Sequence, residues 1–140
     1  MRLTSSNVGN TPFEKRLGHN PAILKSWEAL EKAFFSKTSL GDAILEQVRR
    51  ALAFENECLY CQLKAGRPVV DVSDKKLRAA IDFAQKFARN PKSIGDEDFR
   101  ELARYFSETE MAEFCPFVCF ISACQQLGRM YQLGENEQAN

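Results

Sequence analysis

The sequence predicts an all-α fold, and three observations lead to this class. Apolar residues recur at spacings of three and four along most of the chain, as they do on one face of a helix. Residues that start helices precede these segments, and Gly or Pro ends several of them. No segment shows the alternation of a half-buried strand. Because 140 residues suffice for one sizeable core, we expect a single domain over 1–140, with flexible ends at 1–17 and 135–140.

The N-terminal half predicts two amphipathic helices. The first begins with Asn20 as its N-cap and Pro21 at the first helical position, where both residue types are favoured. The second follows Ser39 as its N-cap and runs to about Phe54. The inward faces that we expect are Ile23, Leu24, Trp27, Leu30 and Phe34 in the first helix, and Ile44, Leu45, Val48, Ala51 and Leu52 in the second.

A short third helix is predicted from Cys58 to Lys64. Asn56 offers a turn and cap position before it, and Gly66 and Pro68 end it. A pair of cysteines therefore lies at the N-terminus of this helix.

The C-terminal half predicts three more helices. Ser73 caps the first of them, acidic residues begin the second, and Ser107 forms a capping box with Glu110 for the third. The last helix is apolar on almost every side over 114–123, which predicts a buried position at the centre of the fold and in an oligomer interface. We expect Pro116 to kink this helix or to mark its start.

Composition and charge exclude several classes of protein. The 19 basic and 19 acidic residues leave no net charge, so the chain lacks the basic surface of a nucleic-acid-binding protein. The longest apolar run is too short to cross a bilayer, and the N-terminus has no signal-peptide segment. We therefore expect a cytoplasmic protein with neither a membrane nor a nucleic acid as its partner. Five cysteines without an export signal also argue against a framework of structural disulfides.

Cys58 and Cys61 are the sharpest chemical feature. Residues three apart share a helix face, so their sulfurs can come close enough for a disulfide or a shared metal ion. A helix N-terminus lowers the pKa of a thiol, and Lys64 adds positive charge one turn later. Tyr60 either hydrogen-bonds a sulfur or packs. Spacing and position favour a redox dithiol over two buried packing residues.

A zinc site is the competing interpretation, with Cys115 and Cys119 completing four thiolate ligands. Their spacing is one helical turn rather than that of a zinc knuckle, and the only histidine, His19, lies beside a helix cap. We therefore expect no metal and no cofactor. The three cysteines of the last helix are predicted to be packing residues: Cys115, Cys119 and Cys124.

A family resemblance adds to these observations. The runs "LGHNPAILKSWEAL", "LGDAILEQVRRALAFENECLYCQLKAG" and "RAAIDFAQKFARNPKSIGDEDFRELARYF", followed by an apolar helix, resemble AhpD-like alkylhydroperoxidases of the carboxymuconolactone decarboxylase superfamily. The resemblance covers residues 17–134. Its most specific element is a glutamate 12 residues before a CxxC pair, which Glu46, Cys58 and Cys61 match.

The resemblance implies an AhpD-like bundle of about five to seven helices that assembles as a trimer or hexamer. It implies reduction of small hydroperoxides or exchange of disulfides by Cys58 and Cys61, with a dithiol reductant such as a lipoyl or thioredoxin-like protein. One cysteine would become a sulfenic acid and the other would resolve it. Glu46 would belong to a proton relay near the pair, although a helical wheel instead places it on the surface beside Arg49 and Arg50.

Ala65 departs from the family pattern. Members with demonstrated peroxidase chemistry usually carry a histidine at this position, four residues after the second cysteine, and alanine transfers no proton. The alternative interpretation is therefore a non-catalytic member that acts as an oligomeric scaffold or ligand-binding protein. Lactone decarboxylation, the activity of the superfamily's namesake, has little support because that branch does not depend on a CxxC pair.

Overall fold

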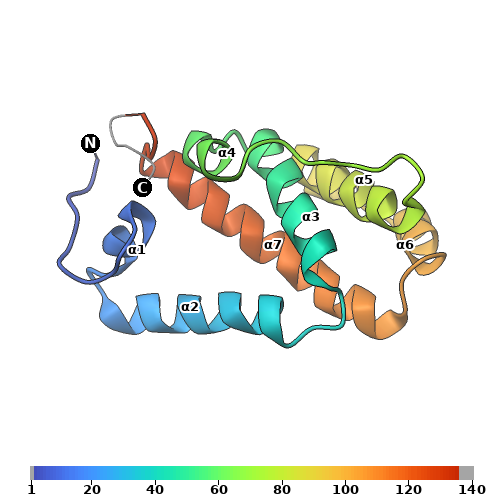
Figure 1. Ribbon diagram of the computed structural model, residues 1–140, viewed down its shortest axis with the longest axis horizontal. Helices are drawn as coiled ribbons and strands as arrows, with labels where there is room; N and C mark the ends of the chain where they lie inside the picture. The colour runs from blue at the N-terminus through green and yellow to red at the C-terminus, as the bar shows by residue number, and fades with distance from the viewer. Residues whose placement is uncertain (1, 136–140) are drawn as a thin grey trace.

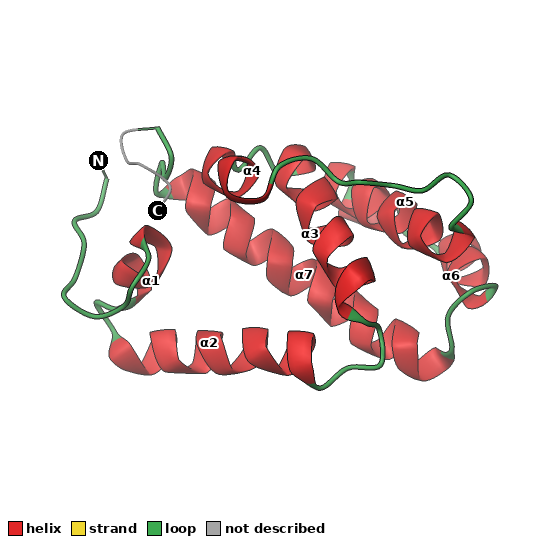
Figure 2. Cartoon of the chain, in the orientation of Figure 1, coloured by secondary structure: helices red, strands yellow, loops and turns green. Residues whose placement is uncertain are grey.

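The computed structural model describes residues 2–135, which form seven α-helices, one short 3-10 helix and no strand, as the all-α prediction requires. The longest helix, α7 (Glu108–Met130), runs diagonally through the fold; α2 (Pro21–Ser36) lies on one side of it, and α3 (Asp42–Glu55) and α5 (Lys75–Arg89) lie on the other (Figure 1). The remaining helices are α1 (Pro12–Leu17), α4 (Leu59–Ala65), η1 (Pro91–Ser93) and α6 (Asp96–Ala103). Figure 2 shows the loops that join them.

Helix α7 is central because its phenylalanines are buried against several neighbours. Phe117 makes edge contacts with Phe34 and Phe35 of α2, at ring-centroid distances of 5.5 Å and 5.6 Å. Phe114 stacks on Phe106 at 5.7 Å, next to α6. These contacts fix α2 and the α6 region against α7, and each aromatic pair contributes about 0.5–1.5 kcal/mol beyond area burial.

Helix α7 lies at the centre of the fold as expected, a single chain leaves one of its sides exposed, and the oligomer interface stays a prediction. Pro116 and Cys119 are exposed, while Phe117 and Val118 between them are buried. The capping box of Ser107 is present, so α7 starts there and Pro116 lies inside the helix. A single chain of this size covers only part of an apolar helix.

Two predicted N-caps are displaced by one or two residues, because the hydroxyl of each predicted serine binds another side chain. The hydroxyl of Ser39 donates to Glu113 of α7 at 2.7 Å, so Gly41 takes the N-cap position of α3. The hydroxyl of Ser73 donates to Asp71 at 2.7 Å, and Asp74 caps α5. A serine hydroxyl that binds another side chain, whether near in the sequence like Asp71 or distant like Glu113, is not available to cap a helix.

Helix α1 is absent from the sequence prediction, which assigned no helix before Asn20. Thr11 and Glu14 form a capping box around Pro12 at the first helical position. Ser6 donates from its hydroxyl to the carbonyl of Lys15, which holds the preceding segment on α1. Six residues are too few for a helical period to appear in the sequence. Of the predicted flexible C-terminus, residues 136–140 lie outside the described residues.

Helix α2 turns part of its predicted face inward, and Trp27 packs against the core as expected. Leu24 and Phe34 are buried, whereas Ile23 and Leu30 are 49% and 45% exposed.

None of the helices within residues 2–135 combines the length and apolarity that crossing a membrane requires.

Candidate active site

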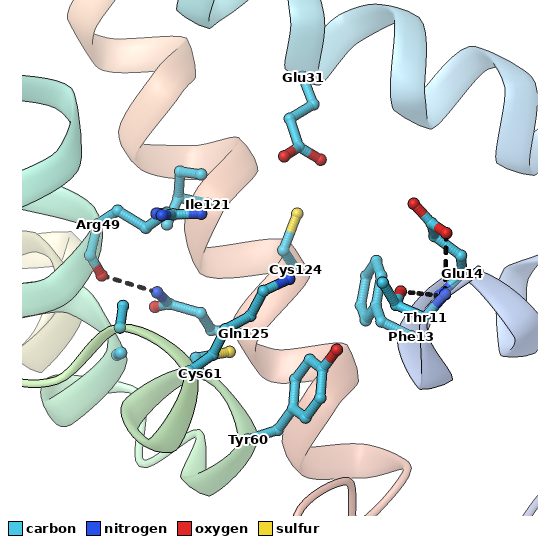
Figure 3. A pocket seen from close by; sticks show the side chains of 13 residues that line it. Thr11, Phe13, Glu14, Glu31, Arg49, Tyr60, Cys61, Ile121, Cys124 and Gln125 are labelled. Atoms are coloured by element: carbon cyan, nitrogen blue, oxygen red, sulfur yellow. Dashed lines mark hydrogen bonds between the residues drawn. The ribbon is translucent and has the colours of Figure 1, made fainter. Parts of the chain in front are cut away.

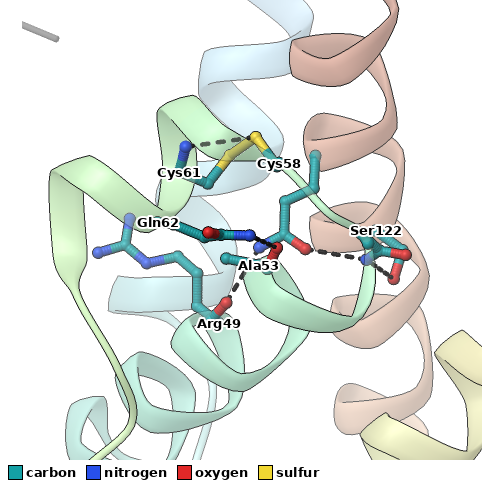
Figure 4. Close-up of a disulfide and its surroundings, with 8 residues drawn as sticks. Arg49, Ala53, Cys58, Cys61, Gln62 and Ser122 are labelled. Atoms are coloured by element: carbon teal, nitrogen blue, oxygen red, sulfur yellow. Dashed lines mark hydrogen bonds between the residues drawn. A yellow bond between two sulfur atoms is a disulfide. The ribbon is translucent and has the colours of Figure 1, made fainter. Parts of the chain in front are cut away.

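The cysteine pair is formed by the turn that joins α3 to α4. Asn56 ends α3, Glu57 takes a left-handed conformation with φ 52°, and Cys58 becomes the N-cap of α4. The two sulfurs form a disulfide, with the Cα atoms of Cys58 and Cys61 5.3 Å apart (Figure 4). The predicted proximity of Cys58 and Cys61 is confirmed. The backbone N–H of Cys61 also donates to the Cys58 sulfur at 3.3 Å, as an N-cap hydrogen bond.

The two cysteines differ in their access to solvent. Cys58 is fully buried, at 0% exposure. Cys61 is half-buried and lines a cavity of about 150 Å³ that is enclosed by α1, α2, α3, α4 and α7. A molecule that enters the cavity therefore meets the sulfur of Cys61 first.

The backbone of α7 lies directly against the buried sulfur. Gly128 is buried, and a Cβ atom at this position would lie 2.9 Å from the Cys58 sulfur and 3.9 Å from the Cys61 sulfur. Only glycine permits this approach without displacing the disulfide.

A buried amide network holds the cysteine turn on α7. The side-chain amide of Asn56 donates to Gln125 Oε1 at 2.9 Å and to Ser122 Oγ at 3.2 Å. The amide of Gln125 donates in turn to the carbonyl of Arg49 at 3.0 Å. These bonds tie α3, α7 and the residue two before Cys58 together, so the disulfide has one defined position.

The cavity wall combines apolar and charged side chains (Figure 3). Glu14 is occupied, because its carboxylate accepts from the backbone N–H groups of Asn10 and Thr11. Glu31 and Cys124 lie together at the side facing α2 (Figure 3). The lining residues are Thr11, Phe13, Glu14, Glu31, Arg49, Ala53, Tyr60, Cys61, Lys64, Ala65, Ile121, Cys124 and Gln125.

No family model and no curated protein matches this sequence. Among solved structures, an uncharacterized peroxidase-related protein from Silicibacter sp. TM1040 is similar at 17% identity and TM-score 0.77, over 93% of this chain and 81% of that one. The alkylhydroperoxidase AhpD core of an uncharacterized peroxidase-related protein from Ralstonia eutropha JMP134 is similar at 17% identity and TM-score 0.69, over 83% and 72%. The debrominase Bmp8 is similar at 20% identity and TM-score 0.65, over 92% and 78%.

This chain has the AhpD-like fold. The resemblance seen in the sequence is confirmed at the level of the fold, since identities of 17% to 20% carry the architecture and not the activity.

Tyr60 and Lys64 line the cavity of the AhpD-like domain beside Cys61. Tyr60 is buried, and the Lys64 ammonium lies 5.8 Å from the centroid of its ring. Ala65 also lines the cavity, at the position where the resemblance led us to expect histidine. The structure therefore brings Cys61, Tyr60 and Lys64 together on one wall.

Glu46 does not reach this wall. Its carboxylate accepts from Arg49 Nη2 at 2.6 Å and from Arg50 Nε at 3.0 Å, as the helical wheel predicted. Arg49 lines the cavity, so Glu46 is linked to the site through that side chain. The proton-relay role that the resemblance implied for Glu46 stays a prediction.

Cys124 is the cavity residue that the sequence analysis missed, because it was predicted to be a packing residue. Trp27 Nε1 donates to its sulfur at 3.1 Å. Burial raises the pKa of the Cys124 thiol to about 11. The only sequence signal was its place in the most apolar helix, where a cysteine facing a cavity looks the same as one in the core.

The free cysteines give no support to the zinc interpretation. Within residues 2–135, no three His, Cys, Asp or Glu side chains gather as metal ligands would. Cys119 is exposed, so its predicted packing role is wrong.

Proposed function

We propose that this protein is a thiol-dependent oxidoreductase of the alkylhydroperoxidase type, which reduces hydroperoxides or exchanges disulfides through Cys58 and Cys61. One observation carries the proposal: the disulfide has one sulfur in a cavity wall and the other buried behind it. A redox dithiol needs one accessible sulfur and one protected sulfur that closes the cycle. The AhpD-like fold and the similarity to peroxidase-related proteins support it.

The difference in exposure between the two cysteines supports different roles for the two sulfurs. In the reduced protein the Cys61 thiolate attacks the terminal oxygen of a hydroperoxide, the O–O bond breaks, and Cys61 becomes a sulfenic acid while an alcohol leaves. The Cys58 thiol then attacks Cys61, which forms the disulfide and releases water.

Regeneration requires a dithiol reductant, for which we propose a lipoyl or thioredoxin-like protein. The reductant attacks the accessible Cys61 sulfur and Cys58 leaves as a thiolate. The N–H of Cys61 donates to the Cys58 sulfur, and a helix N-terminus favours negative charge there. A stabilised thiolate leaves faster.

The test of the proposed function is consumption of tert-butyl hydroperoxide by the purified protein with dihydrolipoamide as reductant. We expect turnover that stops when both Cys58 and Cys61 are replaced by serine. Equal rates for the wild type and the double variant would reject the proposal.

A non-catalytic oligomeric scaffold is the second candidate, favoured by Ala65 and by the position of Glu46. Alkylation of the reduced protein over a pH series separates the candidates: a Cys61 that reacts only above the ordinary thiol pKa, about 8.5, supports the scaffold. Both candidates include a homo-oligomer, trimeric or hexameric, to which the exposed apolar side chains Ile23 and Leu30 would contribute. A monomer in sedimentation velocity would contradict that assembly.

Replacing Glu46 by glutamine tests the relay. Because the carboxylate is held by Arg49 and Arg50 at the surface of α3, we expect kcat/KM for hydroperoxide to fall less than about threefold, or ~0.7 kcal/mol. The measurement is the steady-state rate with dihydrolipoamide. A loss of about 100-fold, with a shifted pH profile, would instead establish Glu46 as part of the relay.

A further inference from the structure

The cavity holds a second thiol besides the redox pair. Cys61 approaches it from α4 and Cys124 from α7, and Figure 3 places the Cys124 sulfur between Cys61 and the carboxylate of Glu31. Glu31 acts electrostatically on Cys124, which confirms that the two side chains are close. A molecule in the cavity therefore lies between two sulfurs.

Trp27 fixes the orientation of the second thiol. An indole N–H only donates, so the Cys124 sulfur accepts in the bond at 3.1 Å, and its own S–H proton is not used there. The indole ring is held by Phe120 and Phe13, at ring-centroid distances of 5.4 Å and 6.4 Å. The S–H of Cys124 is thus available to an acceptor in the cavity.

Cys124 keeps its proton at neutral pH. Burial raises its pKa to about 11, with the negative charge of Glu31 acting in the same direction and Arg49 and the Trp27 hydrogen bond opposing. A thiol that stays protonated is a poor nucleophile, but it always carries a proton that it can donate.

The other polar groups on the wall are less suited to this role. The carboxylate of Glu14 is engaged by backbone N–H groups. Tyr60 and Lys64 belong to α4, the helix that carries Cys61, whereas Cys124 comes from a different helix, α7. A sulfur attacks in line with the O–O bond, so the leaving oxygen points away from Cys61.

We propose that Cys124 donates the proton to the leaving oxygen when Cys61 attacks a hydroperoxide, with Trp27 as its positioning residue; this rests on the proposed function. The S–O bond forms at Cys61, the O–O bond breaks, and the alkoxide takes the S–H proton of Cys124 to leave as an alcohol. The Cys124 thiolate recovers a proton from water. No further oxidant or reductant takes part in this step.

The leaving group tests the proposal. An alkoxide from tert-butyl hydroperoxide needs a proton, whereas the acetate that leaves peracetic acid does not. Replacing Cys124 by alanine should lower kcat/KM for tert-butyl hydroperoxide about 100-fold, the usual contribution of a general acid, and leave peracetic acid within about threefold. Cys124→Ser, which retains an O–H donor, should recover part of the loss, and Trp27→Phe should give a smaller loss with the same substrate dependence.

The matched control is Cys119→Ala, which removes an exposed cysteine from the same helix outside this cavity and should change neither rate. Equal losses with both substrates, or no loss with either, in folded Cys124→Ala would overturn the role of Cys124. Failure of the wild type to reduce either substrate would instead reject the proposed function, and the proton-donor role with it. Circular dichroism of each variant verifies the fold.

Discussion

Replacing Cys61 by serine should abolish hydroperoxide reduction, with a fall in kcat/KM of at least about 1000-fold. Cys61 is the cysteine of the pair that lines the cavity, and Cys58 lies buried behind it. A serine hydroxyl at neutral pH is a far weaker nucleophile than a thiolate. The measurement is the rate of consumption of tert-butyl hydroperoxide, both in a single turnover of the reduced protein and at steady state with dihydrolipoamide.

Cys58→Ser is the informative companion to this variant. Because Cys58 acts only after the peroxide has reacted, its loss should leave one rapid equivalent of peroxide consumption and stop the cycle at the Cys61 sulfenic acid. A dimedone adduct on Cys61, located by mass spectrometry, would mark this intermediate. If Cys61→Ser gives the burst and Cys58→Ser does not, the two sulfurs have the opposite roles from those assigned by exposure.

Replacing Gly128 by alanine should lower the free energy of unfolding by about 1–3 kcal/mol. The new Cβ atom would lie 2.9 Å from the Cys58 sulfur, closer than van der Waals contact allows, and the sulfur belongs to a short turn held at both ends. Either α7 or the disulfide must move. Urea denaturation of the oxidised protein measures the loss, and the melting temperature should fall by several degrees.

Gly95→Ala is the matched control for Gly128→Ala. Gly95 has an extended backbone, and a Cβ atom there would meet no heavy atom within 4 Å, so its replacement should change stability by no more than about 0.5 kcal/mol. An unchanged stability for Gly128→Ala, with the disulfide intact, would show that α7 and the cysteine turn adapt without cost. The inference that only glycine fits at position 128 beside the Cys58 sulfur would then be wrong.

The fold explains why the disulfide depends on distant parts of the chain. Asn56 and Gln125 are joined by a buried hydrogen bond, although 69 positions separate them. Gly128 adds backbone contact on the same turn. The position of the sulfurs is therefore set by α7 as well as by the local CxxC turn. Substitutions of buried residues in α7 should consequently alter the geometry of the disulfide.

The helical class, most helix starts, and the position of Cys58 and Cys61 at the start of a helix could be predicted from the amino-acid sequence. These features are local: caps act within three residues, and helical periodicity is visible in any segment of two turns or more. Helix α1 could not be predicted because six residues show no helical period. The N-caps predicted at Ser39 and Ser73 are wrong because these hydroxyls bind Glu113 and Asp71 instead.

Long-range packing determines which sulfur of the pair meets the cavity and that Cys124 faces it, and neither could be predicted from the sequence. A helical wheel gives the face on which a residue lies and not the neighbour that covers this face. The neighbour can come from a distant part of the chain: Trp27 donates a hydrogen bond to Cys124 although 97 positions separate the two residues. Whether a cysteine is core or site is settled by this long-range packing, because a thiol suits both environments equally well.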